Sequence, residues 1–149
     1  MQRRLFLSVL SLSILWISSA FGDAITPAPG SPERRAICDT VREHVLARVA
    51  LKKPPMKVVF KIDHLRVDGG WAWFEGIPMQ ENGAFLPEGY LPDMAYIMVL
   101  QRNKAGWKVV EDQSRGDVPS PEEVGDLMKR HNGLPLSILP KVWRDALGR

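Results

Sequence analysis

The stretch VVFKIDHLRVDGGWAWFEGIP, residues 58–78, predicts a β-hairpin and therefore an antiparallel sheet. Its first half alternates between apolar and polar residues, and the apolar ones are Val58, Phe60 and Ile62. The pair Gly69-Gly70 is typical of a tight two-residue turn. Leu65 and Val67 are out of phase with the preceding apolar residues, so we expect a β-bulge near His64.

Two more strands extend this hairpin into a sheet. Residues 94–102 are apolar almost throughout, and residues 107–112 form a second short apolar run after the turn at 103–106. Short connections of this kind join antiparallel neighbours, because parallel strands need a longer crossover. We therefore expect a four-stranded antiparallel sheet.

A long helix precedes the strands and a short one follows them. The segment Ser31-Pro32-Glu33 is typical of a helix start, and apolar residues at helical spacing extend the helix to about Leu51. A capping box at Ser120 begins a short helix to about His131, and a proline-bounded apolar tail follows at 134–143. The predicted fold class is α+β: one long N-terminal helix packed on the sheet as a roll, with a short C-terminal helix and a docked tail.

The second and third strands are apolar on both sides, which indicates that both faces of the sheet are covered. We expect the long helix to cover the face of Trp71 and Trp73, because three indoles, including that of Trp107, fill a space that a thin valine stripe leaves open. On the opposite face we expect Phe74, Ile97, Val99 and Val110. The tail, or a second copy of the chain in a homodimer, would cover that face, and the aromatic cluster is then core.

The first residues are typical of a secretory signal peptide. Arg3 and Arg4 precede an apolar run from Leu5 to Ile17, and small residues follow at 18–22. The run is too short to span a bilayer comfortably, so we expect cleavage and no stable membrane anchor afterwards. The predicted organisation is a signal peptide at 1–22, a flexible linker at 23–30 and a single domain at 31–149, exported to the periplasm.

The charge balance argues against nucleic-acid binding. The full chain has 20 Lys and Arg against 17 Asp and Glu, and two of these arginines belong to the expected signal peptide. The mature protein is then almost neutral, whereas nucleic-acid binding needs a strongly basic patch.

No cofactor or metal site is expected. Cys38 is the only cysteine, so it makes no internal disulfide, and its place on the apolar stripe of the helix predicts a buried thiol. The three histidines, His44, His64 and His131, have no spacing typical of metal ligands.

Four segments together resemble a family of small exported bacterial proteins of uncharacterised function. They are VVFKIDHLRVDGGWAWFEGIP, AYIMVLQR, GWKVVED and GDVPS, within residues 58–120. The element order is also similar to that of cystatin-like and NTF2-like rolls. The resemblance implies a fold and an exported location, but it implies no activity, cofactor or catalytic residue.

Two functional hypotheses follow. The first is a non-catalytic module that binds a partner protein or a small apolar ligand through Phe74 and the apolar loop at 79–93, with Phe85 and Tyr90 as contacts. The alternative is a small-molecule enzyme of NTF2-like type. It would use Glu75, or the pair Asp63 and His64, as acid or base, because desolvation beside an indole perturbs a carboxylate.

Overall fold

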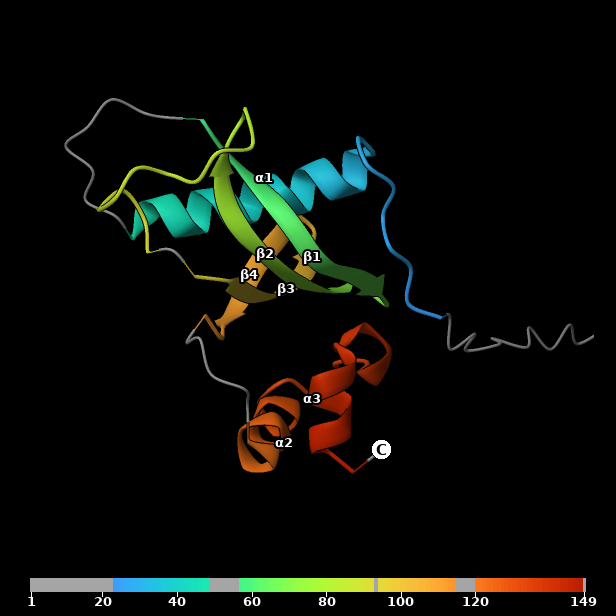
Figure 1. Ribbon diagram of the computed structural model, residues 1–149. Coiled ribbons are helices and arrows are strands. Elements are labelled where there is room, and N and C mark those ends of the chain that lie inside the picture. The colour runs from blue at the N-terminus through green and yellow to red at the C-terminus, as the bar shows by residue number, and fades with distance from the viewer. Residues whose placement is uncertain (1–22, 49–56, 93, 115–119, 149) are drawn as a thin grey trace, which may run out of the picture.

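A computed structural model describes residues 23–48, 57–92, 94–114 and 120–148 of the chain. It has three layers: the helix α1 (Pro32–Ala47), the sheet, and a helical C-terminal segment (Figure 1). The predicted α+β class with a four-stranded antiparallel sheet is confirmed. The expected signal peptide, and the predicted last turn of the first helix, lie outside the described residues.

The sheet is an open meander in which each strand pairs with its neighbour in the chain. The strands are β1 (Val58–Asp68), β2 (Trp71–Gln80), β3 (Tyr96–Asn103) and β4 (Gly106–Asp112), in the order β1-β2-β3-β4. All three pairings are antiparallel, and β1 and β4 form the edges. Gly69 and Gly70 close the first hairpin with φ values of 55° and 83°, the left-handed conformation that a tight turn of this type requires.

The predicted bulge in β1 is confirmed, because the register shifts between Ile62 and His64. The extra residue returns Leu65 and Val67 to the face that Phe60 and Ile62 already share. The same shift turns His64, Arg66 and Asp68 together to the opposite face, opposite Glu75, Trp73 and Trp71 of β2.

The face toward α1 has an apolar core. Ile37, Val41 and Val45 of α1 are buried against Phe74 and Met98 of the sheet. Phe60 and Phe74 pack edge to face, with ring centroids 5.1 Å apart. Ser31 caps the helix, since its hydroxyl accepts a hydrogen bond from the Arg34 backbone N–H at 3.2 Å.

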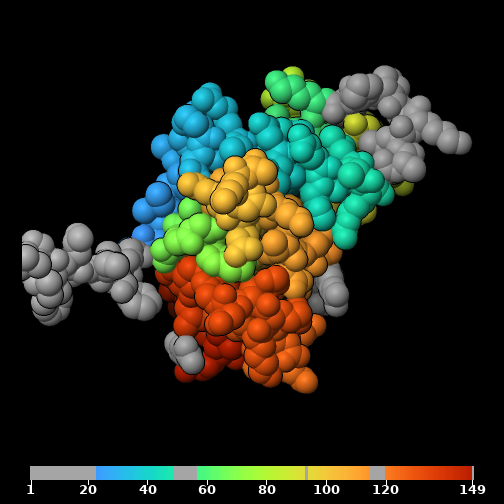
Figure 2. Space-filling model, turned by 180° about the vertical axis from the view of Figure 1, so that it is seen from behind, coloured from blue at the N-terminus to red at the C-terminus, as the bar shows by residue number. Residues whose placement is uncertain are grey.

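The C-terminal segment covers the other face as a compact cap, seen from behind in Figure 2 below the sheet. Its elements are α2 (Pro121–Arg130), the 3-10 turn η1 (Leu136–Ile138) and α3 (Lys141–Ala146). At its centre the Trp73 and Trp143 rings pack edge to face, 4.6 Å apart, and both side chains are buried. Around them lie Val99, Val124, Leu127, Leu134, Ile138 and Leu139.

The expected division of the two faces is wrong in one respect. The helix covers Phe74, and the tail covers Trp71 and Trp73. The β2–β3 register is the reason, because Trp73 lies opposite Val99 and therefore shares its face. Trp143, which belongs to the tail itself, fills the space between the tail and the sheet.

The segment at 23–30, expected as a flexible linker, is anchored to the domain. Ile25 exchanges two backbone hydrogen bonds with Val67 at the outer edge of β1, at 2.9 and 2.8 Å. Ala24 is 5% exposed and belongs to the core beneath the tail. The N-terminal segment therefore covers one end of the β1 edge.

Candidate functional site

Two of the three predicted acid–base residues lie side by side on the tail face. His64 and Glu75 are direct partners across the β1–β2 pairing. The His64 Nε2 atom lies 2.8 Å from the Ile138 carbonyl oxygen. Because a carbonyl only accepts, the ring donates its Nε2 hydrogen to η1, and this tie orients the imidazole.

Glu75 has a perturbed carboxyl group. Burial raises its pKa above the usual range, the nearby His64 opposes that rise, and Asp63 adds to it. Asp63 itself is exposed in the bulge and lies outside the layer beneath η1. The structure thus brings together His64 and Glu75, with Asp63 close enough to act through its charge.

Glu111 lies on the same face as Glu75 but serves a different purpose. Its Oε1 atom accepts hydrogen bonds from Arg130 Nε at 2.8 Å and His131 Nε2 at 2.9 Å. Burial would raise the pKa of Glu111, but these two hydrogen bonds and the charges behind them lower it. The group therefore ties β4 to the end of α2 as an ionised carboxylate.

The bulge arranges three polar side chains along β1 beneath η1. His64 donates to Ile138, and Asp68 Oδ2 accepts a hydrogen bond from Ser137 Oγ at 2.6 Å. Arg66 lies between them, opposite Trp73. Sequence reasoning missed Arg66, because a single arginine in an alternating strand gives no signal of a site.

The three predicted contact residues, Phe74, Tyr90 and Phe85, differ in how far they are exposed to solvent. Phe74 is 0% exposed and Tyr90 is 3% exposed, so both lie in the core beneath α1 and present no surface to a partner. Phe85 is 63% exposed. Only Phe85 among the three is accessible from solvent.

Two contacts with the end of β2 hold the backbone of Phe85 in place. It forms an isolated β-bridge with Met79, and its carbonyl oxygen accepts a hydrogen bond from Gln80 Nε2 at 2.7 Å. Beyond it, residues 86–92 and Arg48 line a hollow of about 660 Å³. Leu86 is half-buried and Leu91 is buried, so the loop folds back onto the domain.

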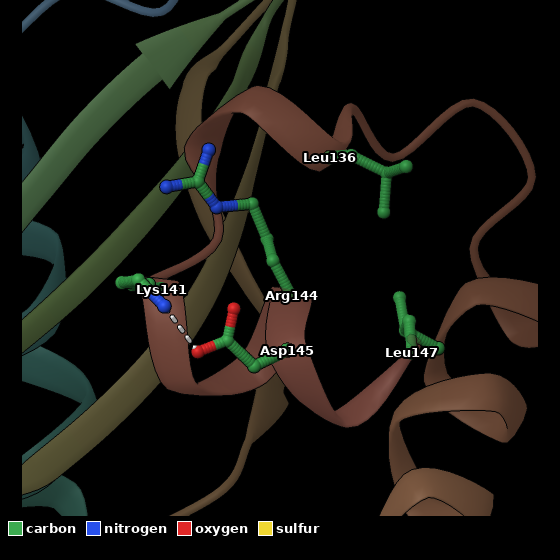
Figure 3. A pocket seen from close by; sticks show the side chains of 5 residues that line it. All are labelled: Leu136, Lys141, Arg144, Asp145 and Leu147. Atoms are coloured by element: carbon green, nitrogen blue, oxygen red, sulfur yellow. Dashed lines mark hydrogen bonds and ion pairs between the residues drawn. The ribbon is translucent and has the colours of Figure 1, made fainter. Parts of the chain in front are cut away.

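A second hollow lies on the C-terminal cap, with a volume of about 430 Å³ (Figure 3). Leu136 and Leu147 face each other across its opening, and Arg144 extends from α3 toward η1. Lys141 pairs with Asp145 at one side. No buried polar group is among its lining residues, so it has little means of orienting a ligand.

The described parts of the chain contain no group of three or more His, Cys, Asp or Glu side chains that could hold a metal ion. Within the same residues, no helix has the length and apolarity needed to span a bilayer.

No known protein family, curated protein or solved structure gives a significant match to this chain. The resemblance of residues 58–120 to small exported bacterial proteins therefore stays a prediction.

Proposed function

We propose that this protein is an exported, non-catalytic binding module that contacts a partner protein through the loop at 81–92, with Phe85 as its apolar anchor. One observation supports the non-catalytic part above all others. The space beside Trp73, which an NTF2-like enzyme would keep open for its substrate, is filled by Trp143 and the fully buried Ile138.

The predicted acid–base residues His64 and Glu75 also take part in contacts within the fold. The Nε2 hydrogen of His64 is used by the Ile138 carbonyl, and Glu75 is covered enough for its pKa to rise. A catalytic carboxylate needs access to a substrate as well as a perturbed pKa. These contacts favour a structural role for both residues over the enzymatic alternative.

The loop supports the choice of a protein partner. Phe85 is one of three large apolar side chains in the described residues that are strongly exposed, together with Ile25 and Val142. A small ligand usually has most of its surface enclosed, which an aromatic ring exposed to 63% does little to achieve. Exposed aromatic side chains on well-anchored loops are instead typical anchors of protein contacts.

The binding test compares Phe85→Ser with Val142→Ser, a control that removes another exposed apolar side chain on α3. Each mature protein is immobilised and exposed to the exported fraction of its producing cells. We expect the wild type and Val142→Ser to retain the same partner, and Phe85→Ser to lose it with unchanged melting. Equal retention by all three proteins would overturn the loop as the contact surface.

The same preparation separates the other candidates. Native mass spectrometry that finds a bound small apolar molecule would replace the protein partner by a ligand. Turnover of a substrate that Glu75→Gln abolishes, while Phe85→Ser leaves it unchanged, would instead establish the acid–base enzyme.

Export is tested on the full-length precursor. We expect the exported protein to begin between Phe21 and Ala24, which N-terminal sequencing detects directly. Recovery of the chain with Met1 intact would contradict cleavage.

A further inference from the structure

We propose that the groove along the outer edge of β1 binds the carboxylate group of an acidic ligand, with Arg66 and Arg34 as its two cationic contacts. This site is separate from the loop at 81–92 and goes beyond the function proposed above. The groove has a volume of about 220 Å³. It is lined by Thr26, Arg34, Ile62, Asp63, His64, Leu65 and Arg66.

Arg66 has a polar group whose partner is missing. Its Nε atom is buried, and no atom of the described residues forms a hydrogen bond with it. The neighbours of Arg66 on the same face of β1, His64 and Asp68, each form one hydrogen bond with η1. Because that atom has almost no accessible surface, a ligand in the groove would meet the terminal N–H groups of the Arg66 guanidinium and not Nε.

Arg34 reaches the same groove from the other side of the sheet. It lies near the start of α1, and its Nη1 atom donates to the Pro27 carbonyl oxygen at 3.2 Å. That bond uses one of the five N–H donors of the guanidinium and fixes its position. No carboxylate of the described residues forms an ion pair with Arg34 or Arg66.

The other described arginines show how unusual this pair is. Arg42, Arg48, Arg102 and Arg130 each pair with a carboxylate. Arg35 and Arg144 are exposed, so water satisfies them. The two half-buried arginines that the described chain leaves without a carboxylate thus line one groove.

The charge and the size of the groove favour a carboxylate. Among the side chains that line the groove, the two guanidinium groups of Arg34 and Arg66 exceed the single carboxylate of Asp63 by one positive charge. A singly charged, planar carboxylate matches both this excess and the fork geometry of a guanidinium. The volume of about 220 Å³ holds about seven waters at roughly 30 Å³ each, enough for a carboxylate on a short carbon chain.

The carboxylate has two natural sources, a free small acid or the C-terminus of an extended peptide. The pairing of Ile25 with Val67 shows that this edge accepts an extended segment, but it also occupies the Val67 end, so a peptide would have to lie nearer residues 62–65. The two sources share their chemistry, and the choice of probes distinguishes them.

The test is an NMR titration of the mature protein, following the backbone amides of residues 62–66. The probes are sodium acetate, inorganic phosphate, and a short glycine–alanine peptide with either a free or an amidated C-terminus. We expect saturable shifts with a free carboxylate. Arg66→Met and Arg34→Met should each weaken binding at least tenfold, while Arg35→Met, the adjacent exposed arginine, should leave it unchanged.

The pattern of binding decides the source. Saturation by acetate identifies a small acid, whereas saturation only by the peptide with a free C-terminus identifies a chain end. Phosphate that binds more tightly than either carboxylate, equal titrations in Arg66→Met and Arg35→Met, or no saturable shift with any probe would overturn the proposal.

Folding of the variants is checked by urea unfolding. Because Met keeps the aliphatic stem and removes the unsatisfied Nε, Arg66→Met should unfold at the same or a higher urea concentration than the wild type. A marked loss of stability would show that Arg66 has a partner within the fold, and would overturn its role in binding. Arg34→Met then provides an independent variant for the titration.

Discussion

The two faces of the sheet are covered in different ways. On one face α1 presents an apolar stripe, and its polar contacts with the sheet border that stripe. Glu33 accepts from Trp107 Nε1 at 2.9 Å, Arg42 Nε donates to the Val58 carbonyl oxygen at 2.6 Å, and Arg48 pairs with Asp112. On the other face the C-terminal cap combines an aromatic centre with ties inside the layer, from His64 and Asp68 to η1. A regular helix repeats the same apolar contacts along the sheet, whereas a short irregular segment depends on individual hydrogen bonds to set its position.

Removal of the cap is the strongest test of this difference. Deletion from Leu134 onward removes Leu134, Ile138, Leu139 and Trp143 from the core. Each buried side chain contributes about 1.5–3 kcal/mol, so the loss approaches the whole stability of a domain, about 5–15 kcal/mol. We expect no cooperative unfolding transition in urea. A monomeric truncation with unchanged stability would show that the sheet does not need this cover.

The next largest effects compare one side chain from each face. Trp73 and Phe74 are neighbours in β2, both are 0% exposed, and they point to opposite layers. Replacement of either by alanine should lower the free energy of unfolding by about 3–5 kcal/mol, as expected for an emptied aromatic site. Denaturant titration measures both. A mild effect at only one position would show that its layer is loosely packed.

The two carboxylates of the tail face should respond to pH with opposite signs. Burial raises the pKa of Glu75 in the folded protein. The contribution of Glu75 to the free energy of unfolding is therefore fully favourable below the unfolded pKa of about 4.3, and it is lost as the pH rises through the folded pKa. For Glu111, burial is outweighed by the bonds from Arg130 and His131, which lower its pKa. Its contribution is present above about 4.3 and is lost as the pH falls through the folded pKa.

Two matched variants test these signs. Glu75→Gln should raise stability at neutral pH and change little in acid, whereas Glu111→Gln should lower stability at neutral pH and change little in acid. Urea unfolding at several pH values measures both. If the two variants changed stability in the same direction at neutral pH, the assigned environments would be wrong.

The smallest effect concerns the α1 face. Cys38 is partly buried against the core, and burial raises its pKa while Arg34 and Arg42 oppose the rise. Less thiolate and less access both slow its reaction, so a thiol reagent should label the native protein more slowly than the protein in denaturant. Equal rates in the two conditions would show that the helix does not protect this position.

The local elements could be predicted because each depends on residues close together in the chain. Gly69-Gly70 determines a hairpin, the change of phase at Leu65 indicates the bulge, and Ser31 begins the helix. The α+β class follows from these elements, since hairpins imply antiparallel pairing.

The candidate site was predictable only in part. His64 and Glu75 were identified by their types and by the bulge, and the structure does place them together. Phe74 and Tyr90 were expected at a contact surface but are buried beneath α1. Their burial depends on what packs over them, and a residue pattern alone does not specify that partner.

The sequence by itself determined the periodicities: which residues form helix or strand, where the strands turn, and that both faces of the sheet are apolar. Only the tertiary structure decided which cover lies on which face, because that depends on the β2–β3 register and on the volume that Trp143 brings from far along the chain. It also decided that Arg66 and Arg34 meet in one groove. Residues distant in the chain become neighbours only through packing, which local patterns do not encode.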